Sequence, residues 1–147
     1  IEALKAMPYI DQNRIVAIGH GGGGLGTLAL ASHSITGLTT VINFSGGRGE
    51  ICLKVQEFND AEMESVFQSL GEKNTLPSLW LYSQDDPSWG KKRPKKWHQL
   101  YATQQSNVTL HQPSKGGDTL IYDQQSWITL ISDYLKDLDL PHAPDTH

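Results

Sequence analysis

Four short apolar runs, separated by segments with helical periodicity, constrain the fold of this chain most strongly. The runs occupy residues 15–18, 38–44, 78–82 and 108–111. Each is almost uninterrupted, which is typical of strands that are buried on both faces. Strands of this kind belong to parallel sheets that have helices on both sides, so the runs already exclude a sheet with one face in water.

Helical patterns lie between the runs. Leu25, Leu28 and Leu30 follow the first run, and Met63, Val66, Phe67 and Leu70 precede the third. The i, i+3, i+4 spacing of an amphipathic helix occurs at Trp97, Leu100 and Tyr101, and a wide apolar stripe runs over 127–138. Strands and helices therefore alternate. This order predicts an α/β fold with a mostly parallel sheet, helices on both faces and right-handed crossovers.

The chain begins at Ile1 inside a helical pattern, so we expect further sequence upstream of it. The first predicted strand would otherwise have an open edge, and we expect the missing upstream half of the domain to cover that edge. Residues 139–147, with Pro141 and Pro144, are expected to form a flexible tail.

Composition excludes several classes of protein. The net charge is −4, which argues against a general nucleic-acid binder. No apolar run approaches the roughly 18 residues that a membrane span needs. The one cysteine, Cys52, excludes an internal disulfide framework. No short spacing of histidine, cysteine and carboxylate residues indicates a metal site, and no cofactor is expected.

The most informative segment runs from Arg14 to Gly26, where a strand leads into four consecutive glycines and a helix begins at once. Three kinds of site use such a layout. A nucleophile elbow, G-x-S-x-G, presents a nucleophile on a strained turn. A dinucleotide fold, G-x-G-x-x-G, admits a pyrophosphate at the helix N-terminus. An H-G-G-G loop donates backbone N–H groups to an oxyanion.

This segment resembles the G-H-S-x-G-G elbow of dienelactone-hydrolase-like proteins, which belong to the α/β-hydrolase superfamily. Gly19, His20, Gly23 and Gly24 match that pattern, and Gly21 stands where the family has serine. The resemblance extends over residues 3–138 and includes the segments 3–15, 41–49 and 77–86. It implies that residues 1–138 are the C-terminal part of an α/β-hydrolase domain.

The resemblance also implies where a catalytic triad would lie, in the order nucleophile, acid, histidine. Gly21 takes the nucleophile position without a side chain that could attack. Asp86 matches the acid, with Asp85 as its neighbouring alternative, and Thr119 falls at the histidine position. A threonine hydroxyl does not titrate near neutral pH, so it cannot replace the imidazole as a base.

The sequence therefore predicts a protein that has lost serine-dependent ester hydrolysis and acts as a non-catalytic binding or scaffold domain. The backbone N–H of Gly22 would still point into the site at a helix N-terminus. Such a position attracts an anionic or ester-like small ligand without any side-chain chemistry.

Two other functions remain open at this stage. An active esterase would need another nucleophile, and Ser45 and Cys52 are the nearby side chains of that type. A nucleotide-binding domain would need a carboxylate at the end of the next strand, which instead ends in Asn43, Phe44 and Ser45.

Side chains around this segment have simpler expected roles. His20 is expected to pack beside the turn, His111 to be structural and His98 to lie on the surface. The cationic run at 91–96 is expected to be a solvated loop and helix start, with an anion-attracting patch as the alternative.

Overall fold

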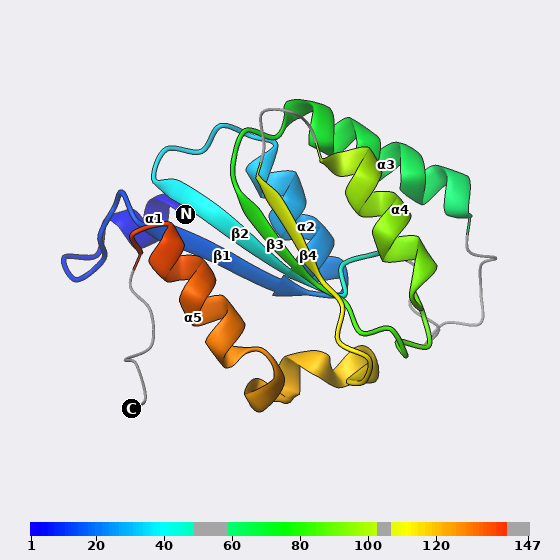
Figure 1. Cartoon of the computed structure of the whole chain (residues 1–147). Coiled ribbons are helices and arrows are strands. Elements are labelled where there is room, and N and C mark those ends of the chain that lie inside the picture. Colours follow the sequence, from blue (N-terminus) through cyan, green and yellow to red (C-terminus); the bar gives the residue numbers. More distant parts are fainter. Residues whose placement is uncertain (49–58, 103–106, 141–147) are drawn as a thin grey trace.

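The computed structural model describes residues 1–48, 59–102 and 107–140, which form a parallel sheet flanked by helices (Figure 1). The strands are β1 (Ile15–His20), β2 (Leu38–Phe44), β3 (Ser78–Leu81) and β4 (Val108–His111). The α-helices are α1 (Glu2–Lys5), α2 (Gly22–Ala31), α3 (Asp60–Lys73), α4 (Lys92–Tyr101) and α5 (Ile128–Asp137). Two 3-10 helices, η1 (Gly117–Tyr122) and η2 (Gln124–Ser126), precede α5.

All four strands are parallel and lie in the order β1-β2-β3-β4. This confirms the predicted fold class, and the strands begin and end within two residues of the apolar runs. Phe44 pairs with Leu81, and Leu81 pairs with His111. The carboxyl ends of β2, β3 and β4 therefore lie in one row, and the loops that follow them meet at one edge of the sheet.

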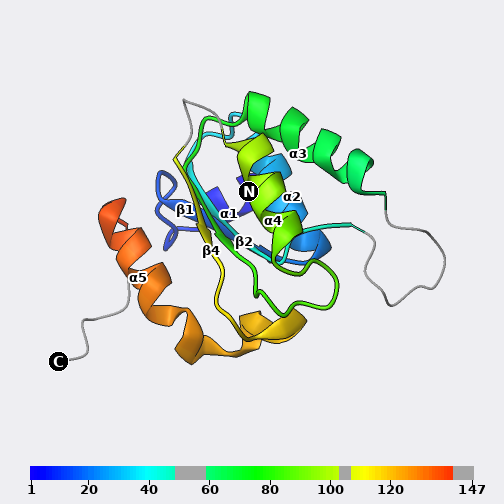
Figure 2. The same cartoon turned by 45° about the vertical axis from the view of Figure 1, so that its right-hand side comes forward.

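Helices cover both faces of the sheet, as the uninterrupted strands predict. Helices α2, α3 and α4 lie on one side, and α5 with the 3-10 helices lies on the other (Figures 1 and 2). Side chains alternate along β3 between these layers. Trp80 and Tyr82 pack toward the α3–α4 side, whereas Leu79 and Leu81 pack toward α5. The polar side chains buried in these strands are hydrogen-bonded, as with Thr40 to the Pro77 carbonyl and Asn43 to the Tyr82 hydroxyl.

Aromatic rings fill the core on the α3–α4 side. Phe67 of α3 stacks on Trp97 of α4 with ring centroids 4.8 Å apart, and Trp80 lies 5.0 Å from Tyr101. These contacts hold α3 and α4 against β3. On the opposite face, the Trp127 ring meets Phe44 edge-on at 5.2 Å and anchors the start of α5.

Helix α3 begins where the sequence supplies a cap. The side-chain oxygen of Asn59 accepts hydrogen bonds from the backbone N–H groups of Ala61 and Glu62, at 3.1 and 3.3 Å. These two bonds satisfy donors that have no partner inside the helix. Asp60 and Glu62 add negative charge in the first turn, where it is favourable.

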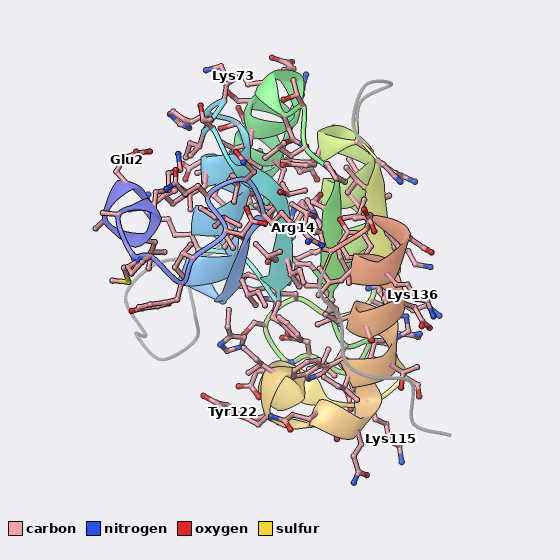
Figure 3. All side chains as sticks on the ribbon, turned by 90° about the vertical axis from the view of Figure 1, so that its left-hand side faces the viewer. Glu2, Arg14, Lys73, Lys115, Tyr122 and Lys136 are labelled. Carbon is pink, nitrogen blue, oxygen red and sulfur yellow. The ribbon has the colours of Figure 1, made fainter. Side chains whose placement is uncertain are left out.

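Strand β1 lies at an edge of the sheet and pairs only with β2 among the described residues. Its Ile18 side chain is 55% exposed, although it lies on the same face as buried Ile42. Tyr122, which is 80% exposed, projects outward from η1 on this side of the molecule (Figure 3). Helix α5 therefore covers the β2–β3 part of this face and leaves β1 partly open.

After α5, the chain remains attached to the domain for a short distance. The guanidinium of Arg14 donates to the carbonyl of Asp139 at 2.6 Å, and Leu140 is buried. The rest of the predicted tail, residues 141–147 with Pro141 and Pro144, lies outside the described residues. Cys52 lies outside them as well. No helix in the described residues has the length and apolar character that a membrane crossing requires.

Two glycines of α2 test how closely this helix approaches β2. A Cβ at position 24 would lie 2.4 Å from Asn43 Oδ1 and 2.9 Å from Gly46 Cα, whereas a Cβ at Gly26 meets nothing within 4 Å. We expect Gly24→Ala to lower the free energy of unfolding by about 1–3 kcal/mol. The matched variant Gly26→Ala should raise it by up to about 1 kcal/mol because alanine favours the helix. Urea denaturation measures both, and equal stabilities would contradict the close approach.

Candidate functional site

The turn between β1 and α2 is made by a single residue. β1 ends at His20 and α2 begins at Gly22, so Gly21 alone reverses the chain direction. Its φ is 56° and its ψ is −125°, a conformation that a residue with a Cβ atom rarely adopts. This is a strand-to-helix turn of the kind that presents a nucleophile. The structure places a buried glycine at the point from which that side chain would project.

Backbone hydrogen bonds attach this turn to the end of β2. The N–H of Gly21 donates to the carbonyl of Phe44 at 2.9 Å. The carbonyl of Gly21 accepts from the N–H of Leu25 at 3.1 Å and from that of Gly47 at 3.3 Å. The turn and the loop after β2 thus form one hydrogen-bonded unit, which fixes the conformation of Gly21 from both sides.

Asp86 lies in the loop between β3 and α4 and is only 3% exposed. One carboxylate oxygen, Oδ1, accepts hydrogen bonds from the backbone N–H groups of Ser88 at 2.8 Å and Trp89 at 3.1 Å. The other oxygen, Oδ2, is buried and has no hydrogen-bond partner among the described residues. The carboxylate is therefore held in one orientation, with one oxygen that could accept a further donor.

The neighbouring Asp85 has a different role. It is exposed, and its Oδ1 accepts hydrogen bonds from the Ser83 hydroxyl and from the N–H of Gly117 at 2.8 Å. The Ser83 hydroxyl, helped by the Gly117 N–H, lowers the pKa of the Asp85 carboxyl below its usual value. Asp85 thus ties the loop after β3 to the loop after β4.

Thr119 lies in η1 and is exposed. Its hydroxyl donates to the carbonyl of Gly116 at 3.1 Å, which is a local bond within the same loop. The residue before it contacts the other end of the site, because Nε2 of His20 is 3.0 Å from the carbonyl oxygen of Asp118. His20 thus packs beside the turn and holds the η1 segment there.

These contacts bring the three predicted triad segments together. The residue before Gly21 bonds to the residue before Thr119, and the residue before Asp86 bonds to the loop that carries Thr119. The three segments come from the carboxyl ends of β1, β3 and β4, which are far apart in the sequence. In this arrangement the site holds one fixed carboxylate and neither a nucleophilic side chain at Gly21 nor an imidazole bonded to Asp86.

The structure shows a buried polar group near Asp86 that the sequence does not reveal, the hydroxyl of Tyr82. The hydroxyl of Tyr82 donates to the carbonyl of Gly46 at 2.6 Å and accepts from the side-chain amide of Asn43 at 3.0 Å. Burial, with a smaller contribution from the negative charge of Asp86, holds the pKa of Tyr82 well above its usual range. Tyr82 therefore remains protonated and fixes the loop after β2 against β3.

Ser45 is a second residue whose importance the sequence conceals. It is buried and has a φ of 47°, a positive value that is unusual for a non-glycine residue. Its N–H donates to the carbonyl of Leu81 at 2.9 Å, and its carbonyl accepts from the indole N–H of Trp89 at 3.0 Å. Its hydroxyl has no partner within the described ranges. Only an asparagine or a glycine would have signalled such a backbone conformation.

The prediction for His98 is wrong. This histidine is half-buried, its Nε2 lies 2.9 Å from the carbonyl oxygen of Val108, and its ring meets Trp80 edge-on at 5.8 Å. The side chain therefore links α4 to β4. The contact depends on how the helix lies against the sheet, which its own periodicity does not reveal.

The cationic run at 91–96 contains one arginine with hydrogen-bond partners and four exposed lysines. Arg93 pairs with Asp60 at 2.7 Å, and it also donates to the carbonyl of Ser88 at 3.1 Å. Four lysines are exposed, namely Lys91, Lys92, Lys95 and Lys96. In the part of the chain that the structure describes, no group of three or more histidine, cysteine, aspartate and glutamate residues could hold a metal ion.

No protein-family model matches the sequence, and no curated protein matches it. Solved structures do match the fold. Acylaminoacyl peptidase from Pyrococcus horikoshii superposes with a TM-score of 0.70 and 15% identity, over 99% of this chain and 27% of that one. Est1E from Butyrivibrio proteoclasticus superposes with a TM-score of 0.70 and 15% identity, over 93% of this chain and 65% of that one. A dienelactone hydrolase-type protein from Klebsiella pneumoniae superposes with a TM-score of 0.64 and 17% identity, over 88% of this chain and 53% of that one.

This chain thus spans only part of each of these larger proteins, and the first of them is nearly four times as long as the matched region. At identities of 14–17% the likeness concerns the fold rather than the chemistry. Taken with the sheet order and the turn at Gly21, these likenesses show that the chain has the α/β-hydrolase type of fold.

Proposed function

We propose that this chain has lost serine-dependent ester hydrolysis and acts as a non-catalytic binding or scaffold domain. The observation that carries the proposal is the turn at Gly21. The backbone keeps the conformation of a nucleophile elbow, with φ of 56° and ψ of −125°, while the residue there has no side chain. The chain therefore retains the framework of a hydrolase site without the atom that attacks the substrate.

The acid and base positions support the same function. A base must lie within hydrogen-bond reach of the nucleophile, and an acid must orient that base. Asp86 is buried and fixed by two backbone N–H groups, and none of its side-chain hydrogen-bond partners in the described residues is an imidazole. The Thr119 hydroxyl bonds to its own loop. On this proposal two components of the triad are missing, the nucleophile at Gly21 and the base at Thr119, and they lie in separate segments of the chain.

The features that remain are suited to binding. The first turn of α2 carries no acidic side chain, so its N-terminal partial positive charge is not offset there. A ligand with a carboxylate or an ester carbonyl would find the backbone N–H of Gly22 at this position. β1 has an exposed side chain on its face, Ile18, and it is the edge strand of the described sheet. Both features fit our proposal that the remaining half of the domain packs beside β1.

One observation favours a second candidate, an active hydrolase with a different nucleophile. Ser45 combines a positive φ with a buried hydroxyl that has no partner among the described residues. Strained backbone often occurs at functional sites. A serine nucleophile also needs a base, however, and no histidine nitrogen in the described part of the chain bonds to the Ser45 hydroxyl. The other nucleophile type considered, Cys52, lies outside the described residues.

Nucleotide binding is less well supported. A dinucleotide fold needs a carboxylate at the end of the second strand, where it binds the ribose hydroxyls. In this structure β2 ends with Asn43 and Phe44. The amide of Asn43 is committed to the Tyr82 hydroxyl, and the Phe44 ring packs on Trp127. Neither residue could replace that carboxylate.

We expect the purified protein to hydrolyse short p-nitrophenyl esters no faster than the buffer background, because neither the nucleophile nor the base is present. Ester turnover is measured alongside the Ser45→Ala variant, which removes the remaining buried serine hydroxyl at this edge. Turnover that persists through purification and is abolished by a serine-directed fluorophosphonate would overturn the proposal. If Ser45→Ala removed that turnover as well, the second candidate would be correct.

The Gly21→Ser variant tests the turn itself. We expect it to lower the free energy of unfolding by about 1 kcal/mol or more, because serine has a Cβ and is strained at a φ of 56°. The matched control is Gly26→Ser, which places the same side chain at an unobstructed helical position and should be neutral or slightly stabilising. Urea denaturation measures both, and a neutral Gly21→Ser would place the elbow elsewhere.

Restoring the missing groups should occur in steps. Gly21→Ser alone should give no ester hydrolysis, because no base is available to take the hydroxyl proton. Addition of Thr119→His should recover weak hydrolysis, with Asp86 orienting the new imidazole. A further Asp86→Asn change should then remove the recovered activity. Ester assays on the three variants measure this series, and activity in Gly21→Ser alone would contradict it.

A further inference from the structure

Buried acceptor atoms collect at the carboxyl edge of the sheet. Among the described residues, buried side-chain oxygens without a hydrogen-bond partner include Ser45 Oγ, Asp86 Oδ2 and Gln112 Oε1. These residues follow β2, β3 and β4, whose last residues pair with one another. Two of the three atoms are acceptors only, and the third is a hydroxyl that can accept. The Asp86 and Gln112 oxygens can be satisfied only by a donor, whereas the Ser45 hydroxyl can also donate.

Asp86 is the strongest of these acceptors because its position is fixed. Two backbone N–H groups hold Oδ1, and the residue is 3% exposed, so the carboxylate is fixed with Oδ2 unpaired among the described residues. The donors around it are engaged elsewhere. The Tyr82 hydroxyl donates to Gly46, the Ser83 hydroxyl donates to Asp85, and the indole of Trp89 donates to the Ser45 carbonyl.

We propose that Asp86 Oδ2 receives an N–H group from a small cationic ligand, such as an alkylammonium, a guanidinium or an imidazolium ion. A charged N–H donor forms a shorter and stronger bond to a carboxylate than a neutral donor does. The adjacent Asp85 carboxylate adds a second negative charge at the same loop. Because Asp86 is buried, we expect only a small cation to reach its carboxylate.

This inference rests on the proposed function, because a chain with an intact triad would satisfy this oxygen with its own histidine. It adds a cationic nitrogen to the expected anionic or ester-like ligand. The two proposals can fail separately. Ester turnover tests the loss of catalysis, whereas binding of a cation is measured without any reaction.

The test is an NMR titration of the intact protein with ethylammonium, methylguanidinium and, in a separate series below the imidazole pKa, imidazolium. The backbone amide signals of Ser88 and Trp89 report on binding, because both groups bond to the Asp86 carboxylate. We expect saturable shifts with a Kd of about 1–10 mM for at least one cation. Neutral acetamide, at the same concentrations and pH, should give no saturable shift at these amides.

Two carboxylate variants provide the matched comparison. Asp86→Asn should weaken binding of the cation at least tenfold, since the amide has lost the negative charge. Asp118→Asn removes the same charge from an exposed residue at this edge and should change the Kd by less than about twofold. Equal weakening by both variants, or none by Asp86→Asn, would overturn the proposal.

If Asp86→Asn does not fold, the titration of the wild-type protein still tests whether a cation binds at Asp86. Saturable shifts at Ser88 and Trp89 with a cation, and not with acetamide, support the site. An absence of saturation for all three cations up to about 50 mM, or an equal response to acetamide, would overturn it.

Discussion

The hydrogen bonds between the Gly21 turn and the end of β2 determine how the carboxyl edge of the sheet is built. They require the start of α2 to lie against the loop after β2 with almost no space between them. A Cβ at Gly24 would meet the Asn43 side chain and Gly46, and a Cβ at Gly19 would lie 2.2 Å from the Gly23 carbonyl. Backbone packing therefore explains Gly19 and Gly24, and the positive φ explains Gly21, whereas a Cβ at Gly22, Gly23 or Gly26 would meet nothing within 4 Å.

A second layer of the same edge depends on buried polar contacts from β3. Tyr82 bonds to Gly46 and Asn43, and the indole of Trp89 bonds to the carbonyl of Ser45. These bonds hold the loop after β2 in the conformation that Gly21 needs. Because the rings are buried among Trp80, Trp97 and each other, a change in the aromatic core would be transmitted to the turn.

The sequence predicts the sheet well because strands buried on both faces leave a signal that does not depend on their partners. The acid position at Asp86 is indicated instead by the family resemblance, and the structure places this residue in the loop between β3 and α4. The positive φ of Ser45 and the half-buried position of His98 could not be predicted. Both depend on contacts between segments that are far apart in the sequence, and serine and histidine occur in many environments.

The fold and the chemistry of such a site therefore have separable requirements. The turn, the glycine contacts and the Tyr82 network support the domain and persist without catalysis, whereas an attacking side chain and a base serve only the reaction. Glycine at position 21 adopts a φ of 56° with little strain, so the proposed loss of a nucleophile there would relieve a stability cost. Asp86 also has a structural role, because two backbone N–H groups depend on its carboxylate. Under the proposed loss of catalysis, these structural bonds would preserve the acid even where the nucleophile and the base are absent.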